Sequence, residues 1–233
     1  QGYFEKRQLS GEKMTDILKK GNYVSIAGSI GVGKTSLCRI LAEKYNGKIF
    51  HEVVEKNPFL EDFYADKEQY AFQAQIFFLL SRFKQQQELL QPDLFTNFIV
   101  SDYFFEKDRI FAYLNLNEKE LSLYEILWSL ISKQVTKPDL IVYLQANTDT
   151  LMERIFRRGR AMEQNMEREY IEKLNQAYNY FFFHYNDSNL LVVKTDEIDF
   201  VNDDGHLEII LEKINNFKGG REYFDPFKKD PLK

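Results

Sequence analysis

The chain has 233 residues, of which 44% are hydrophobic, and this is enough for one large α/β domain that packs its own core. Its 31 basic and 36 acidic side chains leave a net charge of −5, which excludes a general cationic surface for a nucleic-acid polymer. The single cysteine, Cys38, excludes an intramolecular disulfide, and no apolar run reaches the roughly 18 residues of a membrane span, so we expect a reduced, cytoplasmic compartment and no membrane partner.

Strands and helices are predicted to alternate along the chain. Short apolar runs predict five strands, at residues 23–27, 48–54, 98–101, 139–145 and 190–195. Apolar residues at helical spacing predict the helices, at residues 34–45, 58–64, 67–90, a stretch ending near 116, 118–133, 148–157, 167–185 and 206–217. This alternation is typical of an α/β fold in which a five-stranded, parallel, doubly wound sheet carries helices on both faces.

One domain accounts for these elements. We expect it to span residues 21–217, after an N-terminal extension at 1–20. Residues 218–233 contain two glycines, two prolines and mixed charges, which favours a surface strap or a disordered tail. The sequence begins with Gln1 rather than Met, which is compatible with a fragment of a longer polypeptide.

A phosphate-binding loop is predicted between the first strand and the first helix. Residues 28–35 match G-x-x-x-x-G-K-[ST] in the strand–loop–helix context that this motif requires. Glycines allow backbone N–H groups to face phosphate oxygens, Lys34 can reach the β- and γ-phosphates, and the Thr35 hydroxyl can bind Mg²⁺. The predicted phosphate-binding residues of this loop are Gly28, Gly31, Gly33, Lys34, Thr35 and Ser36.

The loop motif alone does not separate GTPases, ATPase motors and small-molecule kinases. The D-x-x-G motif of GTPases is absent from the sequence. Residues 136–139 spell the guanine-reading motif, but they precede their strand instead of following it. GTP switching is therefore a minor alternative.

Two acids are expected at strand ends. Glu52 lies at the end of the second predicted strand, and Asp102 follows the third. Ligands of an open parallel sheet bind beyond the carboxyl ends of its strands. A kinase needs one carboxylate to take the acceptor's proton and one acid to hold Mg²⁺, so Glu52 suits the first role and Asp102 the second. The alternative for each is an exposed loop acid, and His51 is interpreted as a packed or capping residue.

An arginine-rich turn is predicted to form a lid over about residues 154–163. It places four arginines in seven residues, interrupted by Gly159. Arg154 and Arg158 share a helix face, and with Arg160 they can close over phosphates and neutralise charge in the transition state. The alternative is a solvated basic helix end, which the helix dipole also favours.

These motifs, in this order, resemble the deoxyribonucleoside kinase family, over about residues 23–195 and most specifically in 64–82 and 137–174. The resemblance implies a P-loop NTPase fold, ATP as phosphate donor with Mg²⁺, and transfer to the 5′-hydroxyl of a deoxynucleoside. It implies that Glu52 is the general base, with Lys34, Arg158 and Arg160 as further catalytic residues. The metal residues are Thr35 and Asp102, and the phosphates are also bound by Arg154 and Arg158.

The resemblance also implies the nucleoside-binding residues. Tyr64 and Glu163 map to the tyrosine and glutamate that hold the 3′-hydroxyl. Gln75 and Arg82, two helical turns apart, map to the pair that reads the base. The predicted nucleoside-binding set is Glu52, Tyr64, Gln75, Arg82, Asp108 and Glu163.

One departure from the family pattern follows the third strand. The family has an acid followed by Arg and Ser, whereas this chain reads Ser101-Asp102-Tyr103-Phe104. Tyr103 replaces an arginine that normally neighbours the 5′-hydroxyl and the base pocket. Its aromatic face is expected to favour a purine by stacking, and Gln75 can pair with adenine, so we predict deoxyadenosine as the best substrate.

The predicted protein is a nucleoside-salvage enzyme, an ATP:deoxynucleoside 5′-phosphotransferase, and a homodimer packed through its long apolar helices. Two alternatives stay open. A nucleoside monophosphate kinase of the thymidylate type would need further basic groups for an acceptor phosphate. A nucleotide-binding regulatory module with impaired catalysis is compatible with the loss of arginine at Tyr103.

Overall fold

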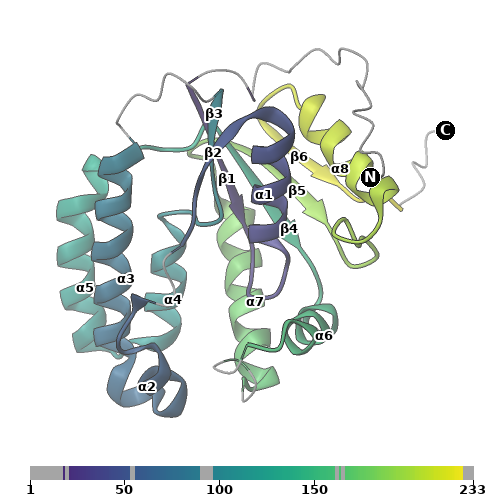
Figure 1. The fold of residues 1–233 in the computed structure, drawn as a ribbon. Coiled ribbons are helices and arrows are strands. Elements are labelled where there is room, and N and C mark those ends of the chain that lie inside the picture. Colours follow the sequence, from purple (N-terminus) through teal and green to yellow (C-terminus); the bar gives the residue numbers. More distant parts are fainter. Residues whose placement is uncertain are drawn as a thin grey trace, which may run out of the picture.

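The sheet is built around strand β1 (Asn22–Ala27), which pairs in parallel with β3 (Phe98–Ser101) on one side and β4 (Leu140–Gln145) on the other. The computed structural model describes Leu18, residues 21–52, 56–89 and 97–160, Glu163, and residues 166–227. Across these residues the strand order is β2-β3-β1-β4-β5-β6, and every pairing is parallel (Figure 1). The doubly wound α/β prediction is therefore confirmed.

The sheet has six strands, so the prediction of five is wrong. Strand β6 (Arg221–Phe224) pairs with β5 (Asn189–Lys194), inside the segment that was expected to be a tail. β6 is a four-residue edge strand whose residues alternate between exposed and half-buried, and it begins with Arg221 and Glu222. Charged, short edge strands carry a weak hydrophobic signal, which is why the sequence pattern missed it.

The helices lie close to their predicted positions. They are α1 (Lys34–Tyr45), α2 (Leu60–Ala65), α3 (Lys67–Leu89), α4 (Lys107–Asn115), α5 (Glu118–Ile131), α6 (Thr148–Arg158), α7 (Arg168–His184) and α8 (Asp204–Asn215). Helix α1 packs on β1, β2 and β3, while α3 packs against α2, α4 and α5. In Figure 1, α1 crosses in front of the sheet, α7 lies behind it, and α3, α4 and α5 form a group at one side.

The core explains why the central strands are apolar on both faces. Residues 140–144 of β4 are at most 2% exposed, because helices cover the sheet on both sides. Leu18 is also fully buried in this core, whereas the rest of the predicted extension at 1–20 lies outside the described residues. Strand β2 (Gly47–Phe50) ends earlier than predicted, and residues 53–55 lie outside the described part of the chain.

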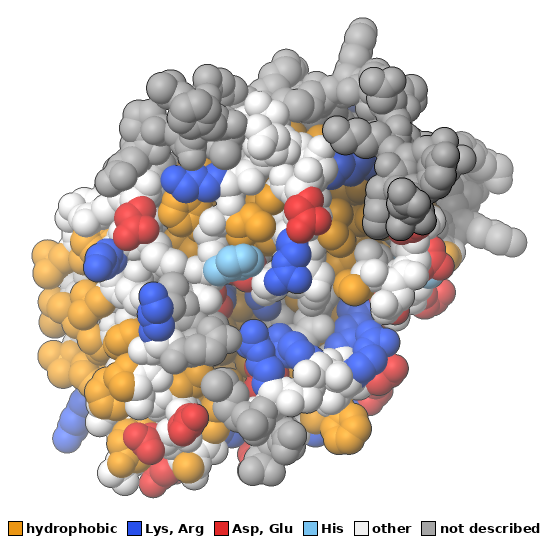
Figure 2. Space-filling model, in the orientation of Figure 1, with side chains coloured by type: hydrophobic (Ala, Val, Ile, Leu, Met, Phe, Trp, Pro, Cys, Tyr) orange, Lys and Arg blue, Asp and Glu red, His pale blue; other side chains and the backbone are white. Residues whose placement is uncertain are grey.

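Helix α5 carries an exposed apolar stripe. Leu123, Ile126, Leu127 and Leu130 follow the i, i+3, i+4, i+7 spacing of one helix face and are 37–63% exposed. Figure 2 shows hydrophobic side chains gathered at the edge of the molecule that carries α3 and α5. Among the described residues, none of the helices combines the length and the apolar character that crossing a bilayer requires.

Candidate active site

A cavity of about 380 Å³, which we call the central cavity, opens at the carboxyl ends of β1, β2 and β3. This is the edge at which the strand order predicts a ligand site. Elements far apart in the sequence contribute to it: the phosphate loop, the end of β2, helices α2, α3 and α4, and the arginine turn. Ten predicted site residues line it, namely Lys34, Thr35, Glu52, Tyr64, Gln75, Arg82, Asp102, Arg158, Arg160 and Glu163.

The phosphate loop depends on its glycines for shape. Gly28 has a φ of 145° and Gly33 a φ of 103°, a region that residues with a Cβ rarely adopt. A Cβ on Gly28 would also lie 2.6 Å from the Leu144 carbonyl oxygen. Gly33 immediately precedes α1, so the loop turns its backbone toward the helix N-terminus, where anions bind favourably.

Lys34 is half-buried beside this loop and donates from Nζ to the Ser29 carbonyl oxygen at 2.9 Å. Burial, with a smaller contribution from the charge of Lys107, lowers the pKa of Lys34 to about 8. A phosphate anion at the loop would favour the charged ammonium, so phosphate binding and protonation of Lys34 support each other.

A second cavity, which we call the outer cavity, shares Lys34, Thr35, Arg158 and Arg160 with the central cavity. It is lined by Gly31, Gly33, Lys34, Thr35, Ser36, Arg154, Arg158 and residues 198–202. Arg154 does not point freely into it. Its Nη2 donates to the carbonyl oxygens of Thr195 and Ile198 at 2.6 and 2.9 Å, which holds the loop after β5. The role of Arg154 in phosphate binding stays a prediction.

Asp102 joins the two strand ends. Its Oδ2 accepts from the Thr35 hydroxyl at 2.7 Å, and its Oδ1 accepts from the Glu52 backbone N–H at 2.7 Å. His51 Nδ1 lies 3.1 Å from Oδ2 and its side chain is 47% exposed, so of the two interpretations of His51, packed or capping, the packed one is wrong. The hydroxyl and carboxylate oxygens of Thr35 and Asp102 are the hard donors that Mg²⁺ prefers.

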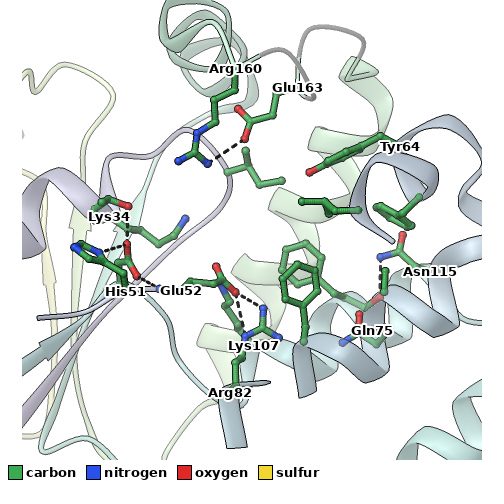
Figure 3. Close-up of a pocket in the computed structure, with 18 of the residues that line it drawn as sticks. Lys34, His51, Glu52, Tyr64, Gln75, Arg82, Lys107, Asn115, Arg160 and Glu163 are labelled. Carbon is green, nitrogen blue, oxygen red and sulfur yellow. Dashed lines mark hydrogen bonds and ion pairs between the residues drawn. The ribbon is translucent and has the colours of Figure 1, made fainter. Parts of the chain in front are cut away.

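Glu52 is held by two cations. Lys107 Nζ lies 2.6 Å from Glu52 Oε2, while Arg82 Nε lies 3.0 Å from Oε1 and its Nη2 bonds to the same oxygen (Figure 3). Arg82 Nη1 forms an ion pair with Asp108, whose Oδ2 accepts from the Tyr124 hydroxyl at 2.8 Å. Burial alone would raise the pKa of Glu52, but the charges and hydrogen bonds of Lys107 and Arg82 hold that pKa well below its usual range.

The far end of the central cavity carries the predicted base-reading residues. Gln75 is buried, and its Nε2 donates to the Asp108 backbone carbonyl at 2.8 Å. Aromatic rings of Phe78 and Phe111 line the same region. In Figure 3, Glu52 lies between Lys34 and Gln75. Asp108 itself is fully buried and acts on the cavity through Arg82 and Gln75 rather than lining it.

Tyr64 and Glu163 lie across the central cavity from Arg82 and Lys107 in Figure 3. Burial raises the pKa of the Tyr64 hydroxyl, so this group stays a neutral donor and acceptor. Glu163 is 6% exposed and pairs with Arg158, and Arg160 Nη1 lies 3.7 Å from its other oxygen. Gly159 ends α6 with a φ of 67°, which turns the chain between these two arginines.

The expectation that Tyr103 stacks on a purine is wrong. Its side chain is fully buried beside Tyr23 and Phe50 and does not line the central cavity. The hydroxyls of Ser25 and Ser101 donate to its carbonyl oxygen at 2.7 and 2.6 Å, fixing the backbone at this point. The aromatic ring gains more from burial between β1 and β2 than from a place among the cavity charges.

Asn115 and Lys107 are two of the polar lining residues that the sequence analysis did not predict. Asn115, at the end of α4, donates to the Phe111 carbonyl and faces Tyr170. Lys107 lies directly before Asp108 and is 3% exposed. The sequence did carry a signal for Lys107. A lysine at the first position of a helix is unfavourable because its charge opposes the helix dipole, so its presence there indicates a nearby carboxylate partner.

Comparison with known proteins gives concordant results. The family model "Deoxynucleoside kinase" matches residues 24–218. Deoxyguanosine kinase of Bacillus subtilis (strain 168) is 33% identical over 197 residues, which cover 82% of this chain and 95% of that protein. Deoxyadenosine/deoxycytidine kinase of the same organism is 31% identical over 204 residues, covering 84% and 93%. The structure of deoxyadenosine kinase from M. mycoides with bound dATP gives a TM-score of 0.72 at 28% identity, covering 84% of this chain and 100% of that one.

Proposed function

The chain belongs to the deoxynucleoside kinase family and phosphorylates deoxynucleosides with ATP, and we propose that deoxyadenosine is its best acceptor. One observation carries the proposal: the central cavity contains a phosphate-loop lysine, a strand-end carboxylate and a buried glutamine, with Glu52 between Lys34 and Gln75 (Figure 3). This order matches the γ-phosphate of ATP followed by the 5′-hydroxyl and the base of a nucleoside.

Gln75 supports recognition of an amino-substituted base. Its Nε2 is engaged with the Asp108 carbonyl, which leaves Oε1 as the acceptor for an exocyclic amino group. Adenine, guanine and cytosine carry such a group and thymine does not. Adenine also offers ring nitrogens to the second N–H of Nε2, which completes the pairing that Asn and Gln make with adenine elsewhere. With Tyr103 buried, this amide is the main support for adenine.

Glu52 is proposed as the general base. It takes the proton of the 5′-hydroxyl as that oxygen bonds to the γ-phosphorus and the bond from phosphorus to the ADP oxygen breaks. Lys34, Arg158 and Arg160 neutralise the charge that develops on the transferred phosphoryl group. Tyr64 and Glu163 are proposed to hold the 3′-hydroxyl, since both line the cavity on the side facing the arginine turn.

Mg²⁺ is proposed at Thr35 and Asp102. In the described part of the chain, no three His, Cys, Asp or Glu side chains form a metal-binding group of their own. Mg²⁺ commonly uses one or two protein oxygens together with water and substrate phosphates, and the Thr35–Asp102 pair fits that requirement. The ion would neutralise phosphate charge and orient the γ-phosphate.

A homodimer and a cytoplasmic site of action complete the proposal. Helix α3, which packs against α5, also carries an exposed leucine, Leu80, which is 52% exposed. A second copy of the chain would cover both faces and remove this apolar area from water. The cytoplasm supplies the ATP that the reaction consumes.

The test is kcat/KM for deoxyadenosine, deoxyguanosine, deoxycytidine and thymidine at one ATP concentration. Deoxyadenosine should rank first and thymidine last, because a site built to pair polar groups rejects a base that leaves them unpaired. A pyrimidine that wins by tenfold or more would overturn the base assignment and leave the family membership intact.

A further inference from the structure

Lys107 has an unusual position for a lysine. It is the first residue of α4, it is 3% exposed, and its Nζ lies 2.6 Å from Oε2 of Glu52. A cation at a helix N-terminus is unfavourable, and a buried ammonium is costly unless it is paired. Helix stability therefore does not account for Lys107, whereas the contact with Glu52 does.

The two cations on Glu52 have different second partners. Arg82 holds Oε1 but also pairs with Asp108, and its guanidinium carbon lies 4.9 Å from the Phe78 ring in the base-reading part of the cavity. Among the described residues, Lys107 forms an ion pair with one carboxylate, that of Glu52, through Oε2. If Arg82 turns toward a base, Lys107 is the cation that keeps Glu52 in place.

The residue at position 103 gives a second reason for the role of Lys107. The resembled family has an arginine at this position, next to the 5′-hydroxyl, whereas the Tyr103 ring of this chain lies in the core and carries no charge. Lys107 reaches the carboxylate of Glu52 from the start of α4, so it restores one positive charge to this part of the cavity.

We propose that Lys107 is the positioning residue of Glu52, holding Oε2 while Arg82 releases Oε1 to receive the proton of the 5′-hydroxyl. The proposal rests on the assignment of Glu52 as the base. In this arrangement Arg82 is free to contact the base, and Lys107 supplies the cation that Tyr103 does not. The other charged groups that face Glu52 and its two cations are Lys34, Asp102 and Asp108.

The first experiment compares Lys107→Met and Lys107→Arg with the unaltered chain. Lys107→Met keeps a side chain of similar length but removes the charge that holds Glu52. We therefore expect kcat to fall by about 100-fold, the usual cost of a misplaced catalytic group. KM for ATP should stay within about threefold, because the phosphate loop is unchanged. Lys107→Arg should recover most of the lost kcat. Lys173→Met, which removes an exposed lysine of α7, is the matched control and should behave as the unaltered chain.

The second experiment is a double-mutant cycle on kcat. If Lys107 acts through Glu52, Lys107→Met should cost little more once Glu52→Gln is present, whereas a separate structural role would multiply the two losses. Normal kcat in Lys107→Met, or multiplied losses, would overturn the role of Lys107. Normal kcat in Glu52→Gln would instead overturn the base assignment. If Lys107→Met does not fold, Lys107→Gln takes its place, and equal kcat for the Gln and Arg variants would refute the proposal.

Discussion

Arg158 of the arginine turn donates to the carboxylate of Glu163, which is 6% exposed, so a proposed phosphate ligand and a proposed sugar ligand neutralise each other. Arg160 lies near the second oxygen of the same carboxylate. Figure 2 shows basic side chains gathered over α6, where this turn begins. The phosphates of a nucleotide would compete with Glu163 for these arginines and leave the carboxylate to a sugar hydroxyl.

Replacing Arg158 tests whether it stabilises the transition state. Arg158→Ala should lower kcat and kcat/KM together, by about 10³-fold, because an arginine that meets transferred charge acts mainly at that stage. Lys34→Ala should also raise KM for ATP, since Lys34 meets the ground-state phosphates. Arg168→Ala removes a 54% exposed arginine of α7, which pairs with Asp149 and lines neither cavity, and serves as control. An effect of Arg158→Ala confined to KM for the nucleoside would mean that Arg158 only holds Glu163.

Glu52→Gln keeps the shape of the side chain and removes the proton acceptor. We expect kcat to fall by about 10²–10⁴-fold with a modest change in nucleoside KM, since general-base catalysis is worth this much. The exposed Glu208 of α8 provides the control Glu208→Gln. Near-normal turnover would move the proton-accepting role to Glu55, which lies outside the described residues, or to solvent.

Asp102→Asn tests the metal assignment. The amide keeps one oxygen near Thr35 but loses the negative charge, so the Mg²⁺ concentration for half-maximal activity should rise by about 10- to 100-fold. The measurement is kcat against free Mg²⁺ at saturating ATP. Asp187→Asn, at a 58% exposed ion pair, is the control. An unchanged Mg²⁺ dependence would remove Asp102 from the metal site.

The sequence was sufficient for features that local patterns encode. The phosphate loop, the apolar strands and the turn at Gly159 each depend on residues close together in the chain, and the structure places them as predicted apart from the earlier end of β2. The sequence was insufficient where long-range packing decides. Lys107 and Glu52 are 55 positions apart, so no local pattern reveals their contact. The burial of Tyr103 depends on Tyr23 and Phe50 from other strands, which the spelling after β3 does not show.

The apolar stripe of α5 gives a prediction about assembly. The double variant Ile126→Glu and Leu130→Glu places charges on residues that are 59% and 63% exposed, so the isolated fold should tolerate them. If the proposed homodimer forms through this stripe, light scattering should show a dimer for the unaltered chain and a monomer for the variant, because buried like charges oppose association. Tyr180→Glu, at an exposed aromatic of α7, is the control. An unchanged mass would exclude this stripe as the interface.

Glu106 gives a prediction about pH and stability. Burial raises the pKa of this carboxyl from 4.5 to about 7, against a smaller opposing effect from its backbone hydrogen bond. Between about pH 4.5 and pH 7, the Glu106 carboxyl is therefore protonated in the folded chain and ionised in the unfolded chain. Where the folded state binds more protons, the free energy of unfolding falls as pH rises. The fall should begin near pH 4.5, end just above pH 7, and reach at most about 3 kcal/mol.

Urea unfolding of the unaltered chain and of Glu106→Gln at pH 5 and pH 8 measures this effect. The variant cannot ionise at position 106, so it should not lose this stability as pH rises. The unfolding free energy of the variant minus that of the unaltered chain should therefore be more positive at pH 8 than at pH 5. Glu208→Gln, at an exposed carboxyl of α8, should show no such shift and corrects for the other groups that titrate in this range. Equal differences at the two pH values would mean that Glu106 is as well solvated in the folded chain as in the unfolded one.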